Sequence, residues 1–243
     1  MKKFELTSEF ITNIFGTKLF RIKALIEFGN VKAGELGGFV EKEENLSQDG
    51  NAWVYDSARV YDNARVYGDA RVYGNACVCG DARVYSNACV CGNARVCDNA
   101  RVYGNAWVYG NACVCGDAWV YDNARVYGNA WVYGNACVCG DAWVYDSARV
   151  YGDACVYGDA RVCGDACVYG DAGYATVHGF GSEYRTTTFF KTKAGDIGVK
   201  CGCFYGNLSE FRKKVVETHG ETKKAKEYLM LADLMEFRFS DNS

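Results

Sequence analysis

The sequence predicts an all-β solenoid, a three-sided parallel β-helix with 18 residues in each coil. Three observations support this prediction. Alanine occupies every sixth position from Ala52 to Ala172, and valine follows each alanine by two residues from Val54 to Val168. The two residues that close each six-residue unit are drawn from Gly, Asp, Ser and Asn, which turn a chain at low cost. A fixed short period over half of the chain is the signature of a repeat architecture.

The period also predicts which side chains face the core. Within one unit, alanine and valine lie two residues apart and share one face of a strand. We expect them to fill a narrow core. The residue between them (Arg, Trp or Cys) and the Tyr or Cys after the valine then point outward. A six-residue side with a corner after each strand suits a triangular coil. Residues 51–170 form almost seven such coils, and at about 4.8 Å per coil the prism is roughly 32 Å tall.

Residues 1–50 are expected to form an N-terminal cap and a first irregular coil, ahead of the repeat array over residues 51–172. One or two short strands are predicted within residues 18–26. Val40 and Leu46 already fall in the register of the alanines, so the solenoid begins inside this first segment. A cap is expected because an open coil exposes unpaired strand edges.

Residues 173–243 differ in composition and predict a small C-terminal α+β module. Short strands are predicted over residues 174–180, 186–192 and 197–201. Asn207, with Glu210 three residues later, predicts the start of a helix through a capping box. A second amphipathic helix follows. The apolar positions are Leu208, Phe211, Val215 and Val216 in the first helix and Ala225, Tyr228, Leu229, Ala232 and Met235 in the second.

The array resembles the hexapeptide-repeat family, whose members form left-handed parallel β-helices. The resemblance rests on the valine and on the small alanine four residues later, and it covers about half of the chain. It implies a left-handed coil and, by analogy, a homo-oligomer such as a trimer. Two features depart from the family pattern: Tyr or Cys follows the valine where glycine is common, and no loop interrupts the coils. With the lead-in over residues 36–43 and the tail, the whole chain resembles uncharacterised repeat proteins of gut bacteria and their phages. That resemblance suggests a phage or prophage origin and implies no activity.

Charge and hydropathy argue against several classes of function. The formal net charge is −3, so we expect no strong attraction to nucleic acid or to an anionic membrane. The apolar runs are too short to span a bilayer, and the N-terminus lacks the apolar core of a signal peptide, which predicts a cytoplasmic protein. Arg and aromatic residues in the outward columns could stack on a nucleotide or a nucleic acid strand. Because twelve Asp outnumber nine Arg in residues 51–170, we favour side-chain ladders that stabilise stacked strands.

The chain has 14 cysteines, and twelve of them lie in outward repeat positions that elsewhere hold Arg, Trp or Tyr. Without a signal peptide, we expect reduced thiols. Four Cys-Val-Cys units place two thiols each on one face, and cysteines 18 residues apart are expected to stack. A thiolate metal site needs about four converging ligands, which a flat face does not obviously offer. We therefore predict no metal site and no other cofactor, and we attribute the scatter of cysteines to codon drift among duplicated repeats.

The candidate binding residues are His178, Ser182, Arg185 and Thr187, at the junction of the last coil and the tail. A repeating surface offers many similar weak sites, whereas these polar groups are unique and lie at the end of a stiff prism. A glycine-rich turn beside them could hold an anion. We therefore predict a non-catalytic scaffold or binding protein. Its C-terminal module would bind a protein or a small molecule, or would build an oligomer.

Two alternatives stay open. The family resemblance implies an acyltransferase that uses an acyl-CoA, because such enzymes generally use a histidine in a groove between subunits as a base. His178 would be that base, since the array itself contains no histidine. The second alternative is a trap for a small molecule, such as a nucleotide signal, held by Arg and Tyr side chains at the junction of coil and tail. The uniform array favours the non-catalytic prediction over both.

Overall fold

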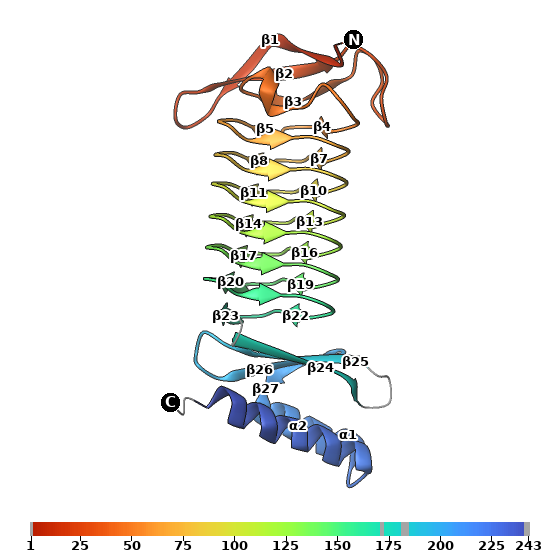
Figure 1. Cartoon of the computed structure of the whole chain (residues 1–243), viewed down its shortest axis with the longest axis vertical. Coiled ribbons are helices and arrows are strands. Elements are labelled where there is room, and N and C mark those ends of the chain that lie inside the picture. Colours follow the sequence, from red (N-terminus) through yellow and green to blue (C-terminus); the bar gives the residue numbers. More distant parts are fainter. Residues whose placement is uncertain (1, 171–172, 181–184, 241–243) are drawn as a thin grey trace.

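The computed structural model describes residues 2–170, 173–180 and 185–240. It confirms a left-handed β-solenoid of about seven coils, with three parallel sheets as the faces of a prism (Figure 1). A strand hairpin covers the N-terminal end, and a small antiparallel sheet backed by two helices covers the other end (Figure 1). Among the helices in these ranges, none has the length and apolar character needed to cross a membrane.

Each face of the prism is one parallel sheet of short strands. The first face joins β3 (Leu36–Val40), β5 (Arg59–Val60), β8 (Cys77–Val78), β11 (Arg95–Val96), β14 (Cys113–Val114), β17 (Trp131–Val132), β20 (Arg149–Tyr151) and β23 (Cys167–Tyr169). The second face joins β6 (Arg65–Val66), β9 (Arg83–Val84), β12 (Arg101–Val102), β15 (Trp119–Val120), β18 (Cys137–Val138) and β21 (Cys155–Val156). The third face joins β4 (Trp53–Val54), β7 (Arg71–Val72), β10 (Cys89–Val90), β13 (Trp107–Val108), β16 (Arg125–Val126), β19 (Trp143–Val144) and β22 (Arg161–Val162).

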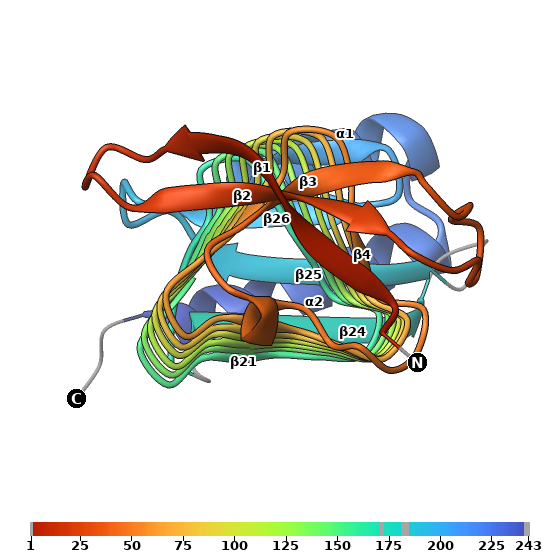
Figure 2. The ribbon, with the colours of Figure 1, turned by 90° about the horizontal axis from the view of Figure 1, so that it is seen from above.

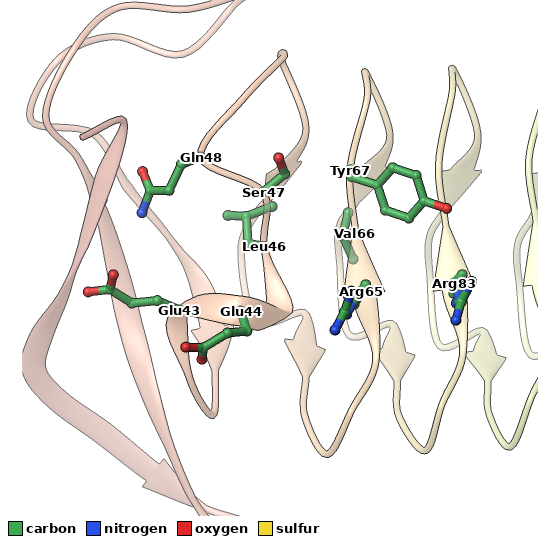
Figure 3. A pocket seen from close by; sticks show the side chains of 9 residues that line it. All are labelled: Glu43, Glu44, Leu46, Ser47, Gln48, Arg65, Val66, Tyr67 and Arg83. Carbon is green, nitrogen blue, oxygen red and sulfur yellow. The ribbon is translucent and has the colours of Figure 1, made fainter. Parts of the chain in front are cut away.

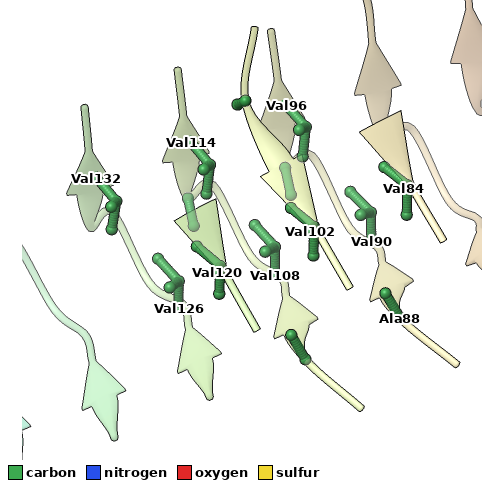
Figure 4. Packing of buried hydrophobic residues seen from close by; sticks show 14 of the residues in the cluster. Val84, Ala88, Val90, Val96, Val102, Val108, Val114, Val120, Val126 and Val132 are labelled. Carbon is green, nitrogen blue, oxygen red and sulfur yellow. The ribbon is translucent and has the colours of Figure 1, made fainter. Parts of the chain in front are cut away.

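Strands that are 18 residues apart pair in register, so each outward column is continuous along the prism. On the third face, for example, Arg71 pairs with Cys89 and Cys89 pairs with Trp107. The alanines and valines of the described coils point inward and are 0–1% exposed (Figure 4). The predicted assignment of core and surface positions is therefore confirmed.

Trp53 is an exception in exposure, since it occupies an outward position and is nevertheless fully buried. The cap covers it: the ring centroids of Phe4 and Phe28 lie 6.2 Å and 5.3 Å from that of Trp53. An outward position at the end of the prism is thus buried by the element that closes the prism.

The corners follow one rule. The first corner residue has a φ between 52° and 72°, whether it is Gly, Asp or Ser. An aspartate there accepts a hydrogen bond from the corner glycine one coil later, as Asp98 does from the N–H of Gly116 (3.0 Å). The second corner residues form their own ladder, in which Asn87 Nδ2 donates to Asn105 Oδ1 at 3.1 Å. Side chains at the corners therefore link successive coils.

The N-terminal cap continues the first face. β1 (Phe4–Thr12) and β2 (Lys18–Ala24) form an antiparallel hairpin, β2 pairs antiparallel with β3, and β3 pairs parallel with β5. Seen from above, the hairpin lies across the triangular end of the coils (Figure 2). The predicted strand within residues 18–26 is β2, whereas β1 was not predicted because most of its residues are exposed and show no regular alternation.

The first coil has the register that the sequence predicted. Val40 pairs with Val60, and Leu46 forms a parallel bridge with Val66. Between them lies η1 (Glu43–Asn45), a short 3₁₀ helix. Lys3 closes this end of the prism, because its Nζ donates to the main-chain oxygen of Ala52 at 3.0 Å. Burial of this ammonium group lowers the pKa of Lys3 to about 8.

The C-terminal module is an antiparallel sheet with two helices behind it. The sheet joins β24 (Tyr174–Phe180), β25 (Arg185–Lys191), β26 (Ile197–Cys201) and β27 (Phe204–Asn207), and the helices are α1 (Leu208–His219) and α2 (Lys223–Phe239). Phe190 faces the solenoid and belongs to its core, whereas Phe189 packs on Phe211 of α1 with ring centroids 6.0 Å apart. The sheet therefore seals the last coil, and the helices cover its far side (Figure 1).

Most elements of the module match the sequence prediction. The strand predicted over 186–192 begins and ends one residue earlier, and β27 was not predicted because Gly202 and Gly206 interrupt its pattern. The capping box of α1 is confirmed. Asn207 Oδ1 accepts from the N–H of Glu210, and Glu210 Oε2 accepts from the N–H of Asn207, both at 2.9 Å.

Candidate functional site

A hollow of about 630 Å³ lies where the cap meets the second face (Figure 3). It is lined by Glu43, Glu44, Leu46, Ser47, Gln48, Arg65, Val66, Tyr67 and Arg83. η1 forms one wall, and the buried Asn45 holds it in place. Asn45 Nδ2 donates to the main-chain oxygens of Asp62 (3.1 Å) and Ala64 (2.9 Å), and Asn45 Oδ1 accepts from the N–H of Lys42 (2.9 Å).

The hollow exists because an outward column ends in a small residue. Ser47 stands one coil before Arg65, and its N–H donates to the main-chain oxygen of Val66 at 2.9 Å. A serine in that place leaves open the space that an arginine occupies in the next coils. Our sequence prediction placed the site at the other end of the chain and missed this hollow. Extending the 18-residue column of Arg65 back into the lead-in would have revealed it.

Two guanidinium groups border the hollow side by side. Arg65 and Arg83 are paired in register, and both side chains are exposed (Figure 3). Within the part of the chain that the structure describes, neither is in an ion pair. Glu43, on the opposite wall, is held by Lys2 with its Nζ 2.6 Å from Glu43 Oε1. Adjacent arginines without carboxylate partners are suited to binding the oxygens of a phosphate group.

An aromatic stack begins at the same hollow. Its members are Tyr67, Tyr85, Tyr103 and Tyr121, with neighbouring ring centroids 4.8–4.9 Å apart and ring planes within 5° of parallel. This confirms the predicted tyrosine ladder. Burial raises the pKa of Tyr85 and of Tyr103, so these hydroxyls stay protonated. The stack starts with Tyr67, which lines the hollow and offers a ring on which a planar group can stack.

The structure does not gather the four predicted binding residues at one place. His178 is exposed on β24, with its Nδ1 3.1 Å from Thr186 Oγ1. Thr187 is buried on the other face of the sheet, where its hydroxyl donates to Cys201 Sγ at 3.2 Å. Arg185 pairs with Phe180 in the β-ladder. The side chain of Arg185 and the whole of Ser182 lie outside the described residues.

The 14 cysteines of the described chain form no disulfide. The predicted vertical stacking is confirmed where Cys137 pairs with Cys155 on the second face. Tyrosine hydroxyls are frequent neighbours of the thiols: Cys89 Sγ donates to the hydroxyl oxygen of Tyr73 at 3.1 Å. At two places the structure brings three sulfurs together, one fewer than the four that we took a thiolate site to need.

Comparison with known proteins identifies the repeat. The pattern of the family described as YdcK beta solenoid repeat matches residues 58–74, 64–80, 94–110, 118–134 and 148–164. One relative is a protein of Escherichia coli (strain K12) described as an uncharacterized acetyltransferase, YdcK. It is 40% identical over 63 residues, which is 23% of this chain and 19% of the relative. The match thus spans about a fifth of that relative's length, and it supports a β-solenoid repeat protein similar to YdcK.

Proposed function

We propose that the chain is a non-catalytic binding scaffold, in which a stiff solenoid holds separate binding surfaces at its two ends. The array between the ends is uniform, and corner hydrogen bonds link its coils. The features that break the repeat are the hollow beside the cap and an exposed apolar face on α2. This apolar face is the observation that carries the proposal, because contiguous exposed apolar surface marks a site of protein contact.

The apolar face of α2 consists of Met230, Leu234 and Phe237, which are 70%, 54% and 76% exposed. Spacings of four and three residues place these side chains on one side of the helix. The opposite side, with Ala232 and Met235, is buried against the rest of the module. The helix is therefore apolar on two sides, and the module covers only one of them.

The charges of α2 favour a second copy of the chain as the occupant of this face. The helix begins with a group of lysines, Lys223, Lys224 and Lys226. Further along it carries Asp233 and Glu236, each held at 2.7 Å from Arg212 of α1. Two copies of α2 packed antiparallel bring the lysines of one toward the carboxylates of the other while the apolar faces meet. Such an isologous contact favours a pair rather than the trimer implied by the family resemblance.

Replacing both Leu234 and Phe237 by aspartate is expected to convert this pair into monomers, because the change buries charges in an apolar contact. Native mass spectrometry and light scattering measure the outcome, with circular dichroism to confirm an intact fold. Trp107→Arg is the matched control. It removes an exposed apolar side chain from a column in which arginine already occurs, and it should leave the pair intact. A wild-type chain that is monomeric at every concentration contradicts the proposal.

The hollow beside the cap supports a second candidate function, the binding of a ligand that carries phosphates and a planar base. The acyl-CoA and the nucleotide of the two sequence-based alternatives share these groups. Arg65 and Arg83 would bind the phosphates, and the ring of Tyr67 would stack on the base. The description of the similar protein as an acetyltransferase supports the acyl-CoA form of this candidate.

Arg65→Ala and Arg83→Ala are each expected to weaken the binding of CoA or ATP by about tenfold or more, because a hydrogen bond to a charged group contributes about 1.5–3 kcal/mol. Isothermal titration measures the affinity. Arg149→Ala, which removes an exposed arginine from the first face, is the control and should bind as the wild type does. Equal affinity for all three variants contradicts this use of the hollow. Transfer of acetyl from acetyl-CoA to an amine, lost in His178→Ala, would establish the catalytic alternative in place of the scaffold.

A further inference from the structure

Two groups of three thiols lie on the faces of the solenoid, away from the hollow. On the first face the Sγ atoms of Cys97, Cys113 and Cys115 all lie within 4.8 Å of one another. On the second face the same holds for the Sγ atoms of Cys137, Cys139 and Cys155. Each group combines side chains from two adjacent coils, so the rigid stacking of the coils sets the distances between the sulfurs.

The sulfurs converge through a contact that recurs along the prism. The side chain after each valine reaches the outward side chain that lies 16 residues later, on the next coil. Tyr61 shows this contact, since Cys77 Sγ donates to its hydroxyl oxygen at 3.4 Å. In each thiol group this contact joins two cysteines, Cys97 with Cys113 and Cys139 with Cys155. One partner in each contact also belongs to a Cys-Val-Cys unit, which adds the third sulfur.

The other two Cys-Val-Cys units lack a third sulfur at the corresponding place. Cys89 meets the hydroxyl of Tyr73 across this contact, and Cys77 meets that of Tyr61. Four units with the same local sequence therefore differ only in their neighbours on the adjacent coils. Two become three-thiol groups and two remain pairs, which provides an internal control.

The geometry of the groups suits a metal that prefers sulfur. A Zn–S bond is about 2.3 Å long, so three sulfurs around one ion lie about 4 Å apart. The observed separations exceed that value by less than 1 Å, which rotation of a half-buried cysteine side chain can close. Thiolates select Zn²⁺ and Cu⁺ over harder cations such as Mg²⁺ and Ca²⁺.

The surroundings of the first group favour thiolates. Hydrogen bonds from Cys115 and Cys97, together with the positive charge of Arg95, lower the pKa of Cys113. Arg95 pairs with Cys113 in the ladder and therefore stands directly beside the group. A cation bound by three thiolates carries a net negative charge, which this guanidinium partly offsets.

We propose that each three-thiol group binds one d¹⁰ thiophilic cation, Zn²⁺ or Cu⁺, through three thiolates. Binding exchanges the thiol protons, which leave to solvent, for three metal–sulfur bonds, and the oxidation state of the metal does not change. Three ligands satisfy trigonal Cu⁺. Zn²⁺ keeps a fourth position, which a water molecule fills.

The test counts metal ions bound to the full chain. The reduced, metal-free protein is titrated anaerobically with Zn²⁺ or with Cu⁺ alone, and native mass spectrometry gives the number of ions bound. We expect two ions for the wild type, one for Cys113→Ser, one for Cys155→Ser and none for the double variant. Cys91→Ser, which breaks a Cys-Val-Cys unit without a third sulfur, is the matched control and should retain two.

Serine substitution is expected to preserve the fold, because these cysteines occupy outward positions where Arg, Trp or Tyr serve elsewhere. Unchanged circular dichroism and thermal midpoint check this for each variant. Release of protons on loading, followed by a pH indicator, provides a second readout of thiolate ligation. No bound ion in the wild type, or loss of an ion in Cys91→Ser equal to that in Cys113→Ser, would overturn the proposal. Retention of two ions in the double variant would overturn it as well.

Discussion

Replacing Ala112 by leucine is expected to lower the free energy of unfolding by about 1–3 kcal/mol, because overpacking a narrow core forces strained side chains and shifts of the main chain. Ala112 is 0% exposed, and its main-chain oxygen accepts a hydrogen bond from Arg95 on the preceding coil. A larger side chain at this position cannot turn outward without breaking that stacking. Urea unfolding followed by circular dichroism measures the change.

The control for this prediction is Arg125→Trp, on an outward position of the third face. Tryptophan already occupies the same column at Trp107 and Trp143, so this change is expected to alter stability by no more than about 0.5 kcal/mol. If Ala112→Leu has the same unfolding midpoint as the wild type, the core is wider than the structure shows.

Replacing Gly128 by valine is expected to destabilise the solenoid by about 1–3 kcal/mol, because valine has to adopt a left-handed conformation. Gly128 has a φ of 70°, and a Cβ there would lie 2.9 Å from the main-chain nitrogen of Asp146 on the next coil. Strain within the residue and a clash between coils therefore act together. Thermal unfolding and urea unfolding measure the loss.

Gly110→Asp is the matched control on the same corner column. Gly110 has glycines one coil before and one coil after it, Gly92 and Gly128, so an aspartate there can accept from the N–H of Gly128 as Asp98 does from Gly116. We expect a much smaller effect than for Gly128→Val. Equal destabilisation by the two variants would show that the corners tolerate no side chain beyond the natural ones.

The candidate sites were harder to predict than the fold. The predicted set at the tail, which included His178 and Thr187, does not face one site, because alternation along the sheet places those two side chains on opposite faces. The hollow at the cap depends on Ser47 lying over Arg65, which requires knowing where the first coil begins. The thiol groups depend on a contact between residues 16 apart, whereas the sequence columns were read at 18. Such contacts depend on how side chains lean between coils, which the repeat period does not contain.

The sequence by itself determined the repeat: the register of Ala and Val, the 18-residue coil, the corners and the capping box at Asn207 are each specified by residues close together in the chain. A period that recurs without interruption imposes the same local geometry on every coil. Only the tertiary structure decided how the hairpin of β1 and β2 closes the prism and which thiols meet. It also decided which side of α2 stays uncovered. These features arise between segments distant in sequence or on neighbouring coils, where packing of particular side chains, rather than local conformational preference, sets the distances.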